Sequence, residues 1–342
     1  MGVYYFAGLG LSSGAVTVPV VYHVERLVRS LHLGMFDPFF AGSGEMSGQD
    51  LKGNIEGFVV ITTPEILDGT IRVGTGKGQI QIPIWNEVWK KNTRKKWKEG
   101  DNIVDIVKSV CLACCKQLQD ATGVPKDVYI YAVLLDLGSN FWDSFYKISQ
   151  VFAFLKGTGK MGKETWINLT GGDNRVQHAM LIASAFQQSH SRAFYYFVER
   201  GYEHYLAPVG SFQKNDLSNP VPDGWTDLPI IAEGMNERHA TIFMSMDHPM
   251  SISELKQYYR QENENENIDM IMTRFRHQGF VSLVSGKKGD LYQLSPMGKQ
   301  MKALLEKQDE WHKKRDGGLA ALVKDPDASS WFKLVFSGKP GD

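Results

Sequence analysis

The sequence predicts an α/β fold, in which a Rossmann-like, doubly wound sheet is followed by a smaller, mainly α-helical domain. Through the first two thirds of the 342 residues, apolar strand-like runs alternate with amphipathic helical stretches, which is typical of parallel strands joined by crossover helices. A proline-rich stretch then ends this alternation, and helices dominate the last third of the chain. The runs that predict strands are 3–9, 58–63, 128–136, 165–169 and 193–198.

Two long amphipathic segments of the first part predict helices at 16–31 and 102–122, and the second contains all three cysteines: Cys111, Cys114 and Cys115. A structural zinc site needs four ligands, and no second Cys or His pair follows at a familiar spacing. We therefore expect these thiols to be buried as small hydrophobic groups, and we expect neither a metal nor a cofactor.

The composition is that of an ordinary globular protein. Hydrophobic residues make up 42% of the chain, and 38 basic residues balance 38 acidic ones. Such a chain has no global field to attract nucleic acid or a membrane surface, so any nucleic-acid contact must be local. No apolar run reaches the roughly 18 residues of a membrane span, and the N-terminus lacks the basic start of a signal peptide. We therefore expect a cytoplasmic protein with no membrane partner.

The elements after the proline-rich stretch predict a winged helix-turn-helix. The expected helices are 237–246, 252–261, 268–278 and 297–314, with a β-pair at 280–284 and 291–294 as the wing. Ser251 and Glu254 form a capping-box signature at the start of the second helix. The candidate DNA contacts lie on the third helix and in the wing turn: Thr273, Arg274, Arg276, His277, Lys287 and Lys288.

An acidic run precedes the third helix of this domain and includes Glu262, Glu264 and Glu266. Strong DNA affinity normally needs several Lys or Arg contacts to phosphate, and acidic groups nearby oppose it. A second interpretation therefore stays open, in which this domain serves dimerisation or binds a protein.

Composition also sets the domain boundaries. Residues 212–229 carry three prolines together with Asn, Asp, Ser and Gly, which is typical of a linker. At the other end of the chain, Trp331, Phe332 and Phe336 indicate that the last segment docks on another surface. We expect a ligand-binding domain at 1–210, a linker at 211–235, a winged helix-turn-helix at 236–315 and a tail at 316–342.

The predicted strand at 165–169 ends in Thr170, Gly171 and Gly172 and runs directly into a helix. Glycines let the backbone approach a ligand closely, and the first N–H groups of a helix, with its dipole behind them, attract phosphate. Asp173, Asn174 and Arg175 follow at the start of the helix. This turn is therefore a candidate phosphate site.

A second turn of this type leaves the first strand through Gly10, Leu11, Ser12, Ser13 and Gly14. A dinucleotide motif would have glycine at the position of Ser13, and no acidic residue ends a second strand at the spacing expected for a ribose contact. NAD is therefore disfavoured. A tight strand-helix turn without any ligand remains an alternative.

The predicted strand at 128–136 also ends in polar residues, including Asn140. An amide at this edge could contact a base or a ribose. It could equally cap the helix that follows. Both interpretations of Asn140 stay open.

With both glycine turns in view, the chain resembles the CARF proteins, the CRISPR-associated Rossmann-fold sensors of cyclic oligoadenylates, over roughly residues 1–210. The resemblance implies a homodimer in which two copies of the site hold one ring on the two-fold axis, and tetra-adenylate is the favoured ring. A ring with even symmetry suits an isologous interface, in which both subunits present the same surface. The ligand-binding residues that it implies are Gly10, Leu11, Ser12, Ser13, Gly14, Asn140, Thr170, Gly171, Gly172, Asp173, Asn174 and Arg175.

The resemblance also implies a function in CRISPR antiviral defence. A C-terminal winged helix in place of a nuclease indicates an allosteric transcription regulator that binds double-stranded DNA. The alternative is a ring nuclease, in which Ser13, Thr170 and Asn174 position a ribose 2′-hydroxyl for attack on the adjacent phosphate without metal. No general base stands out for that reaction. A regulator that responds to an unrelated small molecule is a third possibility.

Overall fold

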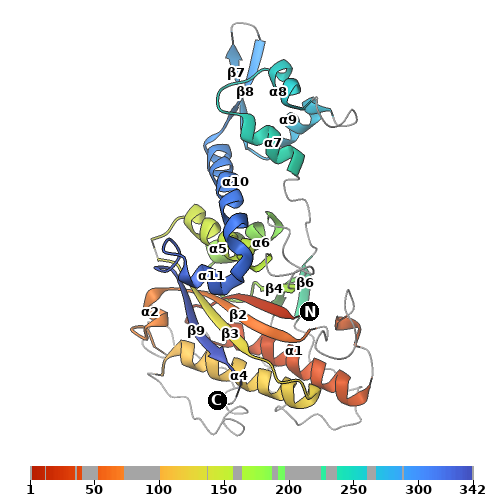
Figure 1. Ribbon diagram of the computed structural model, residues 1–342, viewed down its shortest axis with the longest axis vertical. Coiled ribbons are helices and arrows are strands. Elements are labelled where there is room, and N and C mark those ends of the chain that lie inside the picture. Colours follow the sequence, from red (N-terminus) through yellow and green to blue (C-terminus); the bar gives the residue numbers. More distant parts are fainter. Residues whose placement is uncertain are drawn as a thin grey trace. The chain divides into compact units, whose positions relative to one another are not determined.

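The computed structural model describes residues 2–11, 13–34, 37–40, 53–72, 101–136, 138–156, 164–186, 192–196, 225–228, 237–259, 267–286 and 289–340. The chain forms two compact units (Figure 1). The first comprises Met1–Ile230 together with Arg315–Asp342, and the second comprises Ile231–Lys314.

The first unit is built on a mostly parallel sheet with the strand order β6-β5-β4-β1-β2-β3-β9. Its strands are β1 (Val3–Gly8), β2 (Ile55–Thr62), β3 (Val128–Leu134), β4 (Glu164–Asn168), β5 (Arg192–Tyr196), β6 (Trp225–Leu228) and β9 (Phe332–Gly338). Only the edge strands β6 and β9 pair antiparallel with their neighbours. From β1 the chain adds β2 and β3 on one side and then β4 and β5 on the other, so the strand order reverses between β1 and β4.

Helices cover both faces of this sheet, as the sequence predicts (Figure 1). α1 (Gly14–Leu33) and α4 (Ile103–Thr122) pack on each other on one face, and α5 (Phe141–Lys156), α6 (Asn174–Phe186) and α11 (Gly318–Lys324) lie on the other. Short turns α2 (Pro64–Leu67), η1 (Pro38–Phe40) and η3 (Arg315–Gly317) join the larger elements. Burial on both faces explains why β1 and residues 58–61 of β2 are continuous apolar runs instead of alternating ones.

Alternation along β1 divides the core between the two faces. Tyr5 packs among aromatic rings on the side of α1, whereas the next residue, Phe6, stacks on Phe152 of α5 with ring centroids 4.3 Å apart. The three cysteines of α4 are buried, as expected, and burial raises the pKa of the Cys115 thiol to about 12. These thiols are therefore neutral packing groups.

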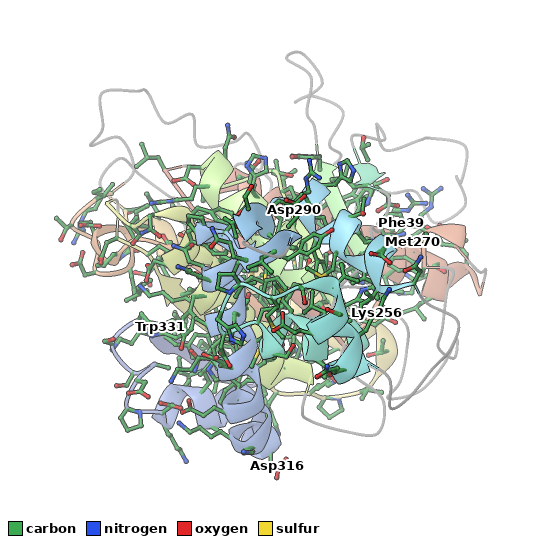
Figure 2. All side chains as sticks on the ribbon, turned by 90° about the horizontal axis from the view of Figure 1, so that it is seen from above. Phe39, Lys256, Met270, Asp290, Asp316 and Trp331 are labelled. Carbon is green, nitrogen blue, oxygen red and sulfur yellow. The ribbon has the colours of Figure 1, made fainter. Side chains whose placement is uncertain are left out.

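The end of the chain belongs to the sheet, although the sequence analysis treated 316–342 as a separate tail. β9 pairs antiparallel with β3, and buried Phe332 stacks on Tyr131 with ring centroids 5.3 Å apart. Trp331, just before this strand, is labelled in Figure 2. The aromatic residues near the C-terminus thus dock on the edge of the first unit's own sheet.

A second strand lies inside the stretch expected to be a linker. Residues 225–228 form β6, and Trp225 stacks on Phe194 of β5 at a centroid distance of 3.7 Å and on Tyr22 of α1 at 5.7 Å. Burial of this large aromatic ring stabilises the short edge strand, together with the ion pair between Asp227 and Arg192 Nε at 3.1 Å. Residues 211–224 and 229–235 lie outside the described residues.

The second unit contains helices and one antiparallel β-pair. Its elements are α7 (Glu237–Ser245), α8 (Ile252–Tyr259), α9 (Ile268–His277), β7 (Val281–Gly286), β8 (Gly289–Leu294) and α10 (Pro296–Lys314). Phe243, Phe275 and Phe280 meet edge to face in its core. The predicted capping box is confirmed: the Ser251 backbone N–H donates to Glu254 Oε2 at 2.7 Å, and the Glu254 N–H donates to Ser251 Oγ at 3.3 Å.

Candidate functional site

The two glycine turns meet at the carboxyl edge of the sheet. β1 and β4 are parallel neighbours, with Ala7 beside Asn168, so the turns that follow them leave the sheet together. A Cβ on Gly171 would lie 2.3 Å from the carbonyl oxygen of Gly8, and a Cβ on Gly8 would lie 2.6 Å from the carbonyl oxygen of Gly171. Gly172 has a φ of +84°. These glycines are therefore required by the contact between the two turns and by the backbone of the second turn.

Gly10 is different from these glycines. A Cβ at Gly10 would meet no atom of the described residues within 4 Å. The neighbouring Leu11 is 41% exposed, which is unusual for a large apolar side chain in this unit. Of Gly10, Gly171 and Gly172, Gly10 is thus the one whose missing side chain leaves room for a ligand. Ser12, predicted to contact the ligand, lies outside the described residues.

Asn168 joins the two turns, and sequence reasoning did not include it among the site residues. Its side chain is fully buried, its Nδ2 donates to the carbonyl oxygen of Ala15 at 2.8 Å, and its Oδ1 accepts from the Thr170 N–H at 2.9 Å. It therefore fixes the first turn of α1 relative to the turn after β4. A polar residue at the end of an otherwise apolar strand is the signal that could have identified it.

The N-terminus of α1 carries no acidic residue and no capping bond from its N-cap side chain. Ser13 occupies the N-cap position and is largely buried, but its side chain makes no capping hydrogen bond. Its carbonyl oxygen accepts from the N–H groups of Val16 and Thr17, and the first turn contains no acidic residue. The positive end of this helix dipole is therefore not neutralised by a carboxylate of its own first turn.

The N-terminus of α6 is already occupied by the protein's own groups. Asp173 Oδ1 accepts from the Val176 N–H at 2.8 Å, and Asp173 Oδ2 pairs with Arg175 Nη2 at 3.1 Å. Arg175 Nη1 donates to the carbonyl oxygen of Ser139. Asp173 thus caps the helix, and Arg175 links this turn to the loop after β3. Of the two turns predicted to bind phosphate, the one after β1 has the more favourable electrostatics.

Asn140 acts as a helix cap. Its Oδ1 accepts from the Asp143 N–H at 3.0 Å, and its carbonyl oxygen accepts from the Ser144 N–H at 3.4 Å. Capping the helix and contacting a base or a ribose are not exclusive, but the side-chain oxygen of Asn140 already accepts a hydrogen bond from the helix. Thr170 is half-buried and Asn174 is exposed at the same edge of the sheet.

Titratable groups elsewhere in the first unit serve packing. His23 is fully buried, with Nε2 donating to the Gly53 carbonyl oxygen at 2.6 Å and Nδ1 accepting from the Tyr5 hydroxyl at 2.5 Å. Burial lowers the pKa of His23 to about 3, so the ring is neutral. Among the residues that the structure describes, no group of three or more His, Cys, Asp or Glu is placed to hold a metal ion.

The predicted DNA contacts of the second unit lie on one helix as far as the structure describes them. Thr273, Arg274, Arg276 and His277 are exposed on α9, where Met270 is 69% exposed. Near the start of α9, Asp269 pairs with Lys256 at 3.4 Å. The basic groups are therefore concentrated in the last turns of the helix. Lys287, Lys288 and the acidic residues 262–266 lie outside the described residues.

None of the helices in the described ranges combines the length and apolarity of a membrane span.

The chain matches no protein-family model. It is 28% identical over 257 residues to an uncharacterized protein of Archaeoglobus fulgidus, a match that covers 71% of this chain and 65% of the relative. Among solved structures, it aligns with Csm6 of Enterococcus italicus bound to cyclic hexa-2′-fluoro-hexa-dAMP, at 12% identity and a TM-score of 0.34. That alignment covers 97% of this chain and 66% of Csm6. The chain therefore spans about two thirds of the length of each of these proteins.

Proposed function

We propose that the first unit is a sensor domain that binds a cyclic oligoadenylate where the turns after β1 and β4 meet. The observation that carries this proposal is the N-terminus of α1, where Ser13 makes no side-chain capping bond, beside Gly10 and at the point where the strand order reverses. In open α/β sheets, ligands bind outside the carboxyl ends of the strands at such a point. The CARF-like pattern of both turns favours a cyclic oligoadenylate as the ligand.

We propose different roles for the predicted site residues. Gly10, Leu11, Ser13 and Gly14 contact the phosphate, as does the sequence-predicted Ser12, while Thr170 and Asn174 reach the ligand from the second turn. Gly171, Gly172, Asp173 and Arg175 hold the second turn in place through their contacts within the protein. Asn140, which follows β3, caps the N-terminus of α5.

A ring-shaped ligand with even symmetry suggests two copies of the chain. Each subunit of a two-fold dimer offers the same turns, so one ring would contact both. We propose a homodimer that binds one ring, with tetra-adenylate as the preferred size. The second unit, in this proposal, is a winged helix-turn-helix whose affinity for DNA changes when the ring binds.

Binding of the ring tests the sensor directly. Calorimetry of the purified chain against cyclic tri-, tetra- and hexa-adenylate, with a linear adenylate and NAD as controls, should show one ring bound per two chains. Chromatography of the ring after incubation would detect cleavage and thereby favour the ring nuclease. Absence of binding by every ring would contradict the sensor.

Gly10→Val is the variant that tests the position of the site. A side chain there has room among the described residues, so the fold should tolerate it, but it would occupy the path of the ligand backbone. We expect G10V to keep its melting temperature and to weaken ring binding by more than about tenfold, or about 1.4 kcal/mol. Gly138→Val is the matched control, because Gly138 also has room for a Cβ and lies in the loop after β3. Equal ring binding by G10V and the wild type would contradict a binding site at Gly10.

A further inference from the structure

The end of β2 carries two polar side-chain atoms that the described part of the protein does not satisfy. Thr63 Oγ1 and Glu65 Oε2 are both buried without a hydrogen-bond partner among the described residues. Thr63 holds the N-cap position of α2, where a threonine hydroxyl commonly accepts a backbone N–H, yet its side chain makes no capping bond. A buried polar group left unpaired lowers stability, so two of them within three residues need a partner that the described residues do not supply.

These residues follow the strand that lies next to the proposed phosphate turn. β2 pairs parallel with β1, with Ile61 beside Gly8, and the Thr62 hydroxyl donates to the carbonyl oxygen of Leu9 at 2.9 Å. Thr63 and Glu65 therefore leave the sheet at the same edge as Gly10. They stand on the side of β1 opposite to the turn after β4.

The chemistry of the pair selects one part of a nucleotide. A carboxylate repels a phosphate, whereas it accepts hydrogen bonds strongly from uncharged hydroxyl groups. A threonine hydroxyl can accept or donate. The ribose hydroxyls of a nucleotide supply such donors a short distance from its phosphate. In nucleotide-binding α/β folds, a carboxylate near the end of the second strand commonly holds the ribose.

We propose that Glu65 and Thr63 bind the one free ribose hydroxyl, the 2′-hydroxyl, of the nucleotide whose phosphate lies at the Gly10 turn, and that they select ribonucleotides over deoxyribonucleotides. This inference rests on the proposed function and adds a subsite to it. The sequence motif for such a carboxylate assumes a spacing of about 20 residues from the glycine turn. Here Glu65 follows a strand that begins only at Ile55, so spacing alone does not reveal it.

The test compares cyclic tetra-adenylate with its 2′-deoxy counterpart by calorimetry on the full chain. The wild type should bind the ribose ring about 10- to 100-fold more tightly, the range for a hydrogen bond to a charged group. Glu65→Gln should lose most of this preference by weakening only the ribose ring. Glu164→Gln is the matched control, because Glu164 begins β4 at the opposite edge of the same sheet. It should keep the full preference.

Thr63 provides an independent measurement. Thr63→Val removes a hydroxyl that has no partner among the described residues, so the melting temperature of the free chain should stay the same or rise. The ribose ring should bind more weakly to T63V, and Thr63→Ser should restore the affinity. A structural threonine would behave differently, because its loss would lower the melting temperature.

The outcomes separate this inference from the function on which it rests. If the wild type binds rings but E65Q keeps the preference for ribose, or weakens both rings equally, the ribose subsite is wrong and the sensor stands. If the wild type binds no ring at all, the sensor is refuted and the subsite falls with it. Chromatography of each ring before and after the titration ensures that cleavage is not mistaken for selectivity.

Discussion

Glu25 is a buried carboxylic acid in the contact between α1 and α4. Gln117 Nε2 donates to its Oε1 at 3.2 Å, and burial raises the pKa of Glu25 from 4.5 to about 7. Between pH 4.5 and about 7, Glu25 of the folded protein therefore keeps a proton that the unfolded chain releases. The contribution of Glu25 to the free energy of unfolding is fully present below pH 4.5. It is lost as the pH rises from 4.5 towards 7, and the total loss is about 3 kcal/mol.

Glu25→Gln should remove this loss. The amide keeps the shape of the protonated acid, so E25Q should be more stable than the wild type at pH 8, by about 1–3 kcal/mol, and similar to it near pH 4.5. Urea titrations at both pH values measure the difference. Asp120→Asn, at an exposed position of α4, removes the same charge and should change stability little at either pH. Equal stability of E25Q and wild type at pH 8 would show that burial does not raise the pKa of Glu25.

At the scale of single residues, the sequence predicted the groups whose chemistry is local. The capping box at Ser251 depends on residues three positions apart, and so it could be recognised in the chain. The role of Asn168 could not, because its partner Ala15 is distant in sequence and meets it only through the register of β1 and β4. Gly171 was predicted for a different reason than the one observed: its neighbour is Gly8.

Among the elements, β9 has the most direct consequence for stability. It closes the edge of the sheet at β3, with Phe332 almost fully buried and Leu334 44% exposed on the same strand. Phe332→Ala should lower the free energy of unfolding by about 3–5 kcal/mol. Leu334→Ala should change it by less than about 1 kcal/mol.

This pair of variants is read by urea titration with tryptophan fluorescence. Because both residues lie on one strand, a difference between F332A and L334A reports burial in the sheet and not the strand propensity of alanine. Similar small effects of the two substitutions would show that β9 contributes little to the first unit. A large effect of L334A would mean that its exposed side chain has a partner in solution.

The elements that could be predicted from sequence are those with a strong hydrophobic period. The strands β1 to β5 and the long helices were found within a few residues, because buried parallel strands and amphipathic helices leave a clear pattern. The edge strands β6 and β9 were not predicted. Both pair antiparallel on the periphery, β6 has only four residues, and the rings that bury Trp225 and Phe332 come from distant segments. Their sequences alone resemble a linker and a tail.

For the whole molecule, the topology makes the candidate site. The turn after β1 and the turn after β4 are far apart in sequence, yet the reversal of strand order places them side by side. Neither turn alone distinguishes a ligand site from a tight connection. At their shared edge, α1 and α6 begin with different electrostatics: Asp173 caps α6, whereas Ser13, the N-cap residue of α1, makes no side-chain capping bond.

The proposed coupling between the two units predicts a reciprocal change in affinity. If cyclic tetra-adenylate changes the affinity of the full chain for duplex DNA from its own promoter region by some factor, saturating DNA must change the affinity for the ring by the same factor. A typical coupling of about 1–3 kcal/mol corresponds to about 5- to 150-fold.

The double variant Arg274→Ala, Arg276→Ala should weaken DNA binding and reduce its salt dependence, since these exposed cations lie on α9. Replacing Lys299 and Lys313, exposed on α10, with alanine controls for the loss of charge alone. Equal DNA binding with and without every ring would refute the coupling, and ring binding that persists in that case would leave the first unit as a sensor whose second unit serves another partner.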